Sequence, residues 1–179
     1  MIYSKQVFIP YQPVLDHSII TSVKKQHNRL SIHQLNYDFI EYLKKLNVSV
    51  FFVEVFHLKP YSSGGIHIDS HRNDTDITKL NYIYGGSNSE MYWYTPNDET
   101  CGEKRMTAIK SNFISYIPEQ VTKLHSQHLI GTNIVQVGIP HNVVNADQDR
   151  YCLSIAIREN KEHITMDRAI EIFTSNSSQ

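Results

Sequence analysis

The chain has 179 residues, 17 Lys and Arg against 18 Asp and Glu, and a formal net charge of −1, which argues against a nucleic-acid partner because phosphate-binding proteins carry a basic excess. A hydrophobic fraction of 40% with a charged fraction of 20% is typical of a folded globular chain, and this length suits a single domain with a sizeable core. No run approaches the roughly 20 apolar residues of a membrane span, and the first residues do not resemble a signal peptide. Two cysteines are too few for a disulfide framework. We therefore expect a cytoplasmic protein without membrane contact.

The first part of the chain predicts a helical layer over about residues 14–47. Between residues 14 and 30 the apolar side chains recur at roughly the helical period, and acidic residues precede basic ones, as the helix dipole favours. Between residues 34 and 46 apolar residues three or four positions apart predict an amphipathic helix, with Asn47 as its stop.

The pattern changes after Asn47, and residues 48–158 are expected to form a β core. The run 48–58 consists mostly of β-branched and aromatic residues, which is typical of a strand. Eight shorter strand candidates, separated by turn-forming clusters, follow at residues 66–69, 79–84, 90–95, 106–110, 112–117, 133–137, 140–144 and 150–158. These elements predict a mainly β fold, a double-stranded β-helix (jelly roll, cupin-like) braced by N-terminal α-helices. A short helix at residues 165–173 and a polar tail would complete a single domain over residues 1–179.

The sequence His67-Ile68-Asp69 is the first candidate for chemistry. Residues two apart in a strand point to the same face, so this imidazole and this carboxylate can both reach one metal ion. His141 lies in another predicted strand and offers a third ligand. Two histidines and one carboxylate, with the remaining coordination positions open, are the ligand set of non-haem Fe(II) oxygenases.

Arg150 opens the predicted strand 150–158 and is the second candidate. Alternation along this strand places Arg150, Cys152 and Ser154 on one face and apolar side chains on the other. The apolar face is expected against the helices, which leaves the guanidinium and the hydroxyl facing a cavity. An arginine there is suited to a bidentate grip on a carboxylate.

With these motifs the chain resembles the 2-oxoglutarate- and Fe(II)-dependent oxygenase superfamily, close to its prolyl- and asparaginyl-hydroxylase-like branches. The resembling region covers about residues 48–158, and its matching pieces are His67-Ile-Asp69, Lys79-Leu-Asn-Tyr-Ile-Tyr-Gly-Gly86, Met91-Tyr-Trp-Tyr94 and Pro140-His-Asn-Val-Val-Asn145 leading to Arg150.

The resemblance implies a role for each matching residue. The iron ligands, and thus the catalytic centre, are His67, Asp69 and His141, and Arg150 is the partner of the 2-oxoglutarate C5 carboxylate. The serine that the family usually carries two places after the arginine is replaced here by Cys152, with Ser154 one pleat further on. Asn81 or Lys79, which share a strand face, are candidates for the cosubstrate's other carboxylate.

The implied activity is a dioxygenase that hydroxylates a C–H bond of an amino-acid residue or small metabolite, with succinate and carbon dioxide as co-products. Its cofactors are Fe(II) and 2-oxoglutarate, with ascorbate as a candidate supporting reductant. The expected partner is a small molecule or a peptide or protein side chain, and the sequence leaves the oligomeric state open.

Two other functions fit the same residues. A cupin-like non-haem iron dioxygenase would use the iron site without 2-oxoglutarate, and Arg150 would then form a structural salt bridge. A non-catalytic jelly-roll binding module would keep the metal for stability alone.

Four further histidines have structural or solvent-exposed roles as alternatives to metal binding. His71 is an alternative ligand but lies in a polar run typical of a solvated loop. His125 and His128 have a zinc-like spacing, yet no cysteine is near to complete a four-ligand site. His57 either lines the same cavity or is a half-buried, hydrogen-bonded side chain.

Overall fold

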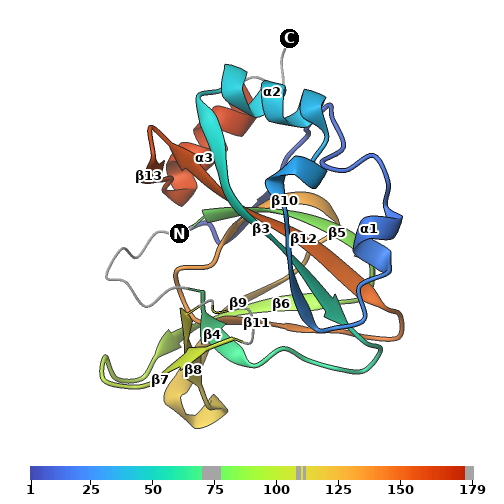
Figure 1. The fold of residues 1–179 in the computed structure, drawn as a ribbon. Coiled ribbons are helices and arrows are strands. Elements are labelled where there is room, and N and C mark those ends of the chain that lie inside the picture. The colour runs from blue at the N-terminus through green and yellow to red at the C-terminus, as the bar shows by residue number, and fades with distance from the viewer. Residues whose placement is uncertain (70–77, 108–109, 111, 176–179) are drawn as a thin grey trace.

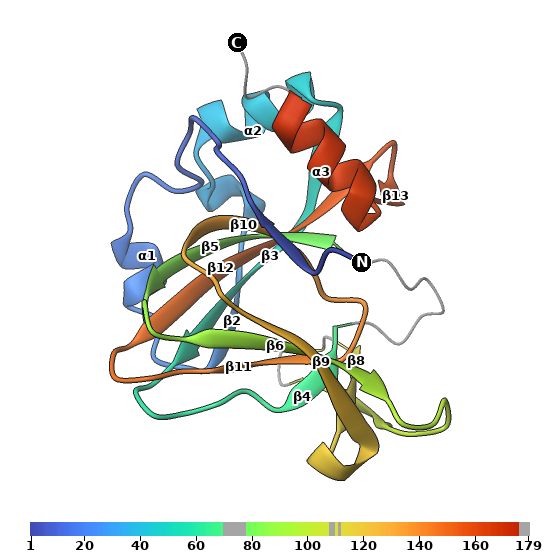
Figure 2. The ribbon, with the colours of Figure 1, turned by 180° about the vertical axis from the view of Figure 1, so that it is seen from behind.

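The computed structural model describes residues 1–69, 78–107, 110 and 112–175, and within these residues two antiparallel sheets face each other (Figures 1 and 2). The larger sheet has the strand order β1 (Ser4–Gln6), β10 (Gly131–Gln136), β5 (Thr78–Gly85), β12 (Arg150–Glu159), β3 (Val48–Leu58) and β2 (His27–Leu30), with β13 (Glu162–His163) pairing to β12. The smaller sheet has the order β7 (Glu103–Met106), β8 (Asn112–Tyr116), β4 (Ile66–Ile68), β11 (His141–Val144), β6 (Glu90–Pro96) and β9 (Val121–His128). This confirms the mainly β, jelly-roll prediction.

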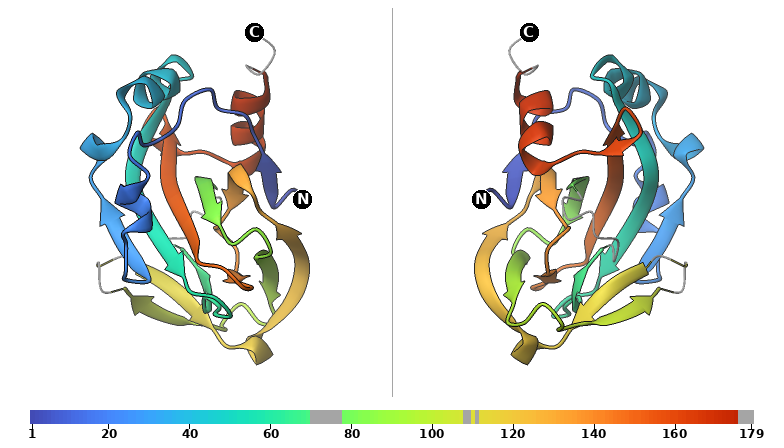
Figure 3. Two further views of the ribbon diagram at one scale, coloured as in Figure 1. Left: turned by 90° about the vertical axis from the view of Figure 1, so that its right-hand side faces the viewer. Right: turned by 90° about the vertical axis from the view of Figure 1, so that its left-hand side faces the viewer.

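The helices cover the outer face of the larger sheet. They are α1 (Ser18–Thr21), α2 (Tyr37–Lys45) and α3 (Met166–Ser175), with a short 3-10 helix at Ile32–Gln34. A second 3-10 helix, Pro118–Gln120, instead joins β8 to β9 in the smaller sheet. Figure 3 shows the two sheets in side view, with α2 and α3 at the same end of the larger one. Helix α2 begins where the side chain of Asn36 accepts from the backbone N–H of Asp38, and it ends before Asn47, whose positive φ of 57° stops the helix as predicted.

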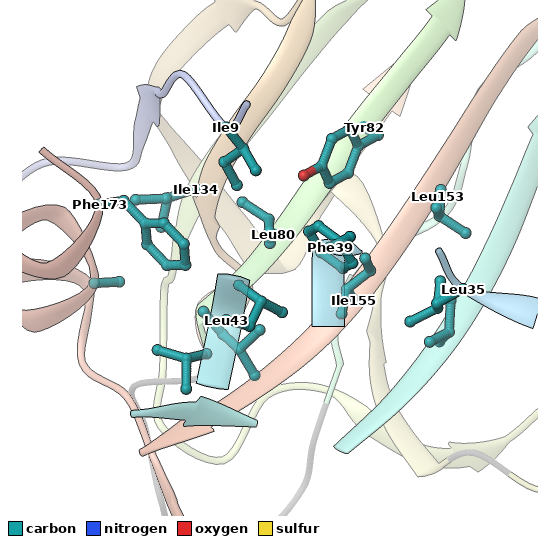
Figure 4. Close-up of a cluster of buried hydrophobic side chains, with 14 of the residues drawn as sticks. Ile9, Leu35, Phe39, Leu43, Leu80, Tyr82, Ile134, Leu153, Ile155 and Phe173 are labelled. Carbon is teal, nitrogen blue, oxygen red and sulfur yellow. The ribbon is translucent and has the colours of Figure 1, made fainter. Parts of the chain in front are cut away.

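The main hydrophobic core lies between these helices and the larger sheet (Figure 4). Phe39 and Leu43 of α2 and Phe173 of α3 are almost completely buried against the strands. Strands β12 and β5 contribute alternate residues to this core, among them Leu153, Ile155, Leu80 and Tyr82. The residues between them in sequence face the other way, toward the smaller sheet, as the alternation along residues 150–158 predicted.

The prediction of a helix over residues 14–30 is wrong. Only Ser18–Thr21 is α-helical, and His27–Leu30 is a strand that pairs with β3, with Leu30 opposite Val53. The eleven-residue strand β3 has a free edge there, and hydrogen bonding to that edge overrides the local helical pattern. The N-terminal helical layer is therefore smaller than expected, and α3 at the other end of the chain supplies much of the covering.

Several strand bounds also differ from expectation. The candidate at residues 106–110 is instead β7 at Glu103–Met106, and residues 108–109 lie outside the described part of the chain. Strands β1, β9 and β13 were not predicted at all. The long strand β3 and the start of β12 match the predicted bounds. Among the described residues no helix is long and apolar enough to cross a bilayer.

Candidate metal centre and the adjoining cavity

Two neighbouring strands of the smaller sheet bring the predicted metal ligands together. His67 is the middle residue of β4 and His141 the first residue of β11, and the two are direct partners in this antiparallel pair. Asp69 follows the end of β4, where its backbone N–H donates to the carbonyl oxygen of Val137 at 3.3 Å. Residues 74 positions apart in the chain thus meet on one face of the sheet because of strand register.

The three side chains converge on one point. The Nε2 atom of His67 lies 3.1 Å from Oδ1 of Asp69, and the Nε2 atom of His141 lies 3.9 Å from the same oxygen. All three donor atoms are within 4.8 Å of one another. Ligands bound at about 2.1 Å on adjacent positions of an octahedral ion are roughly 3 Å apart, so this spacing fits a single divalent cation.

Both imidazoles are oriented by backbone carbonyl groups. Nδ1 of His67 donates to the carbonyl oxygen of Gly65 at 2.7 Å, and Nδ1 of His141 donates to that of Ile139 at 2.9 Å. A carbonyl oxygen can only accept, so each Nδ1 carries a proton and each Nε2 is the nitrogen presented to the shared point. This is the arrangement by which proteins fix the tautomer of metal-binding histidines.

The local charges suit cation binding. Burial lowers the pKa of His141 to about 4, with the nearby His67 adding to the effect, so His141 is neutral at physiological pH. Burial also opposes the charge of Asp69, but the ammonium of Lys79 and the hydrogen bond with His67 outweigh it and hold the pKa of this carboxyl well below its usual range. The site therefore offers a neutral nitrogen and a full negative charge to a metal ion.

A buried ion-pair cluster lies behind Asp69. The Nζ atom of Lys79 is 2.7 Å from Oδ2 of Asp69 and 3.0 Å from Oε2 of Glu54. Nε2 of His27 lies 3.1 Å from the other oxygen of Glu54. Lys79 and Glu54 are 1% and 2% exposed, so these charges depend on one another for compensation.

A cavity of about 400 Å³ lies between the two sheets and includes the three candidate ligands. Its remaining walls are largely apolar and come from both sheets, with Phe52, Phe56 and Leu58 of β3 opposite Ile66 and Phe113 of the smaller sheet. The predicted cosubstrate residues, Arg150, Asn81 and Ser154, all line the same cavity, as does Cys152. All six side chains named as site residues from the sequence are thus at one cavity.

Arg150 is buried at the wall of the cavity, with 3% of its surface exposed. Its Nε donates to the hydroxyl of Ser89 at 2.9 Å, and among the described residues no carboxylate pairs with it. Burial lowers its pKa, but an arginine remains charged at neutral pH. A buried, charged guanidinium without an acidic partner among the described residues has the charge and geometry to accept an anion.

The neighbouring glycine turn holds Arg150 in place. Gly86 has a φ of +56°, and a Cβ atom added there would lie 2.5 Å from Cβ and 2.8 Å from Cγ of Arg150. The turn between β5 and β6 therefore packs directly on the arginine stem, and no side chain fits between them.

Polar groups continue along the same wall. Asn81 and Ser154 are direct cross-strand partners of β5 and β12, and the side-chain oxygen of Asn81 is buried without a hydrogen-bond partner. Cys152 stands between Arg150 and Ser154, and burial raises the pKa of its thiol, so it is a neutral group. The Asn81 oxygen therefore has unused capacity to accept a hydrogen bond.

Three of the other histidines considered from the sequence lie outside the cavity. His57 binds Asp149 through Nε2 at 2.7 Å and stacks on Tyr151, so it has the hydrogen-bonded role and does not line the cavity. His125 stacks on Tyr3, and Nδ1 of His128 donates to the carbonyl oxygen of Ser89. His71, the alternative ligand, lies outside the described residues.

The sequence reasoning missed Glu54 and did not foresee how Lys79 is used. Glu54 is the one charged residue within the apolar run of β3, and an isolated charge in a buried strand requires a partner. That signal could have linked it to Lys79. Both carboxylates hold the Lys79 ammonium, so it is occupied before any cosubstrate arrives.

No sequence-defined protein family matches the chain, and no curated protein matches it in sequence. Three solved structures have a similar fold. A Pseudomonas putida prolyl-4-hydroxylase is 11% identical over 75% of this chain and 71% of that one, with a TM-score of 0.44, and a 2OG-Fe(II) oxygenase family oxidoreductase from Burkholderia pseudomallei is 11% identical over 72% of this chain and 54% of that one, with a TM-score of 0.40. E. coli ycfD is 10% identical over 68% of this chain and 28% of that one, with a TM-score of 0.39. The chain spans little more than half of the Burkholderia protein and about a quarter of ycfD. The solved structures that it resembles in fold thus include a 2OG-Fe(II) oxygenase family member and a prolyl hydroxylase.

Proposed function

We propose that the chain is a 2-oxoglutarate- and Fe(II)-dependent dioxygenase that hydroxylates a C–H bond of an amino-acid residue or small metabolite. The observation that carries this proposal is one cavity lined both by three convergent metal-donor atoms and by a buried arginine that has no acidic partner among the described residues. Of the common ligand sets, two histidines and one carboxylate on one side of an ion are those of non-haem Fe(II) oxygenases.

His67, Asp69 and His141 would hold the iron. The backbone carbonyl groups that orient both imidazoles, and the lysine that binds the second oxygen of Asp69, leave one donor atom from each residue for the metal. With 2-oxoglutarate and dioxygen the iron supplies oxidation of substrate R–H to R–OH, while 2-oxoglutarate is converted to succinate and carbon dioxide. Every atom of dioxygen is accounted for, one in the hydroxyl group and one in succinate.

Arg150 would bind the carboxylate of 2-oxoglutarate that lies away from the metal. Ser89 restrains the guanidinium through Nε, Gly86 packs on its stem and the Cys152 thiol is a further hydrogen-bond partner, so the guanidinium would be held in place for a bidentate pair. The side-chain oxygen of Asn81 is unpaired on the same wall, and we propose that this amide rotates to donate through its nitrogen to the cosubstrate, with Ser154 beside it. This fixed contact sets the position of the cosubstrate relative to the metal donors.

The apolar walls would exclude water and accept the substrate. Phe52 and Phe56 on one sheet and Phe113 on the other bound the space next to the metal donors. The closest fit for such walls is an uncharged aliphatic or aromatic group, on a free metabolite or on a peptide side chain. We propose that the protein works in the cytoplasm, without a nucleic-acid or membrane partner, and that ascorbate supports its turnover.

The test is succinate formation from 2-oxoglutarate with Fe(II), ascorbate and dioxygen. We expect turnover by the wild type, none by His67→Ala, and loss of about 100-fold in 2-oxoglutarate affinity in Arg150→Ala, because two charge-assisted hydrogen bonds are removed. Arg105→Ala on the exposed strand β7 is the matched control and should behave as wild type. Turnover that survives in His67→Ala would refute the iron site.

Metal and cosubstrate binding provide a readout that needs no turnover. Anaerobic calorimetry with Mn²⁺ should show one site, and 2-oxoglutarate should then bind to the wild type but poorly to Arg150→Ala. Metal binding without any 2-oxoglutarate binding would favour a cupin-like dioxygenase. Metal binding that only raises the melting temperature, with no oxidation of any substrate, would favour a non-catalytic binding module.

A further inference from the structure

Lys79 is placed to control how Asp69 binds a metal. Its ammonium donates to Oδ2 of Asp69 at 2.7 Å, whereas Oδ1 of the same carboxylate faces His67 and His141 at 3.1 and 3.9 Å. The two oxygens of one carboxylate thus have separate partners. A carboxylate with both oxygens free can bind a cation through both of them.

Lys79 is itself held rigidly. Glu54 accepts from the same ammonium at 3.0 Å, and the rings of Phe52 and Phe56 lie 5.1 and 6.0 Å from Nζ. A buried ammonium needs these partners to offset lost hydration, and together they fix its position. The side chain is 2% exposed, so it has little freedom to move away from Asp69.

We propose that Lys79 is a positioning residue that keeps Asp69 monodentate and thereby keeps three coordination positions of the metal open, with Glu54 as the anchor of Lys79. This inference rests on the proposed iron site. A keto acid occupies two positions and dioxygen needs a third, so a bidentate aspartate would remove a position that the reaction requires. Lys79 acts through Asp69 and touches neither the metal nor the substrate.

The number of water molecules on a bound metal ion gives a direct test. Water-proton relaxation by Mn²⁺ in the holoprotein scales with the number of coordinated, exchanging waters. In Lys79→Met the freed Oδ2 should turn to the metal and displace one of three waters, so the relaxivity per bound Mn²⁺ should fall by about one third. Glu54→Gln is the matched control, because its amide oxygen still accepts from Lys79 and Asp69 keeps its partner; its relaxivity should equal that of the wild type.

A second variant serves in case Lys79→Met is too unstable to fold. Lys79→Met alone removes the buried cation that pairs with Glu54, so Glu54→Gln/Lys79→Met removes both charges together and should show the same fall. Relaxivity equal to wild type in folded, Mn²⁺-loaded Lys79→Met, or in the double variant, would overturn the role of Lys79 and leave the proposed iron site intact. Failure of the wild type itself to bind Mn²⁺ would overturn both proposals.

Discussion

His67 and His141 are direct cross-strand partners, and the centroids of their rings are 4.5 Å apart. Partners in an antiparallel pair point to the same face of a sheet, so the register of β4 against β11 is sufficient to bring both imidazoles together. A slip of one residue would turn one of them to the opposite face. The meeting of the proposed metal ligands is in this sense a consequence of strand pairing, and the three residues of β4 set its register.

The first prediction concerns the ligands. His141→Ala should weaken Mn²⁺ binding by more than about 100-fold, because one of three coordination bonds is lost, a larger change than loss of a supporting contact produces. Isothermal titration calorimetry under anaerobic conditions measures the affinity. His33→Ala, an exposed histidine in the Ile32–Gln34 turn, should leave it unchanged. Equal affinity in wild type and His141→Ala would contradict the proposed site.

The second prediction concerns Gly86. In Gly86→Ala the new methyl group would overlap the stem of Arg150, so 2-oxoglutarate binding should weaken by about 10-fold or more while Mn²⁺ still binds. Gly131→Ala is the control for backbone strain, since Gly131 also has a positive φ, of 63°, but its Cβ would meet no atom nearer than 3.7 Å. If both variants lost 2-oxoglutarate binding equally, contact with Arg150 would not be the cause.

The third prediction is a pH dependence of stability. Burial would raise the pKa of Glu54, but the charge of Lys79 and the contact with His27 outweigh it and lower the pKa from 4.5 to about 2. A lowered carboxyl pKa stabilises the fold above the unfolded value, here by about 3 kcal/mol, and this contribution is lost as pH falls from about 4.5 toward 2. Urea unfolding at pH 7 and pH 3 measures it.

The matching variant is Glu54→Gln, which has no carboxyl group to titrate at this position. The difference in unfolding free energy between wild type and Glu54→Gln should shrink by about 2 kcal/mol from pH 7 to pH 3. A difference that stayed constant over this range would show that the ion pair with Lys79 does not set the pKa of Glu54.

The fourth prediction concerns Asn145, which closes the loop before β12. Its side-chain amide lies 3.1, 2.8 and 2.7 Å from the carbonyl oxygens of Leu58, Lys59 and Gln148. Asn145→Ala should lower the unfolding free energy by about 2 kcal/mol because buried carbonyl groups lose their donor. Asn88→Ala, which removes an exposed amide, should change it by less than about 0.5 kcal/mol.

Much of the β core could be predicted because strands with one apolar face show it in their sequence. Alternation along β12 correctly separated Arg150 and Ser154 from Leu153 and Ile155. The residues of the candidate site could be named because a histidine and an aspartate two apart in a strand, a second histidine and an arginine in other strands together resemble a known oxygenase pattern, although the His-x-Asp spacing alone is common by chance. Their meeting at one cavity required the three-dimensional structure.

The strands that were not predicted have no clear apolar alternation in their own sequences. Strand β9 reads Val-Thr-Lys-Leu-His-Ser-Gln-His and is mostly exposed, so β6, its pairing partner, defines it rather than any apolar pattern. The strand His27–Leu30 likewise exists because β3 offers an edge. The pairing of Glu54 with Lys79 could not be predicted from the sequence either. The two residues are 25 positions apart in the chain, and β12 lies between their strands, so only the strand order brings them together.

The strands β5 and β12 serve two unrelated purposes with alternate residues, one set filling the core under the helices and the other lining the cavity. Cavity-facing residues such as Cys152 can therefore be exchanged to alter the cavity lining without disturbing the packing of Leu153. Deleting one residue near the start of β12 would have the opposite effect, because arginine and leucine positions would exchange faces and the core and the cavity lining would be lost together.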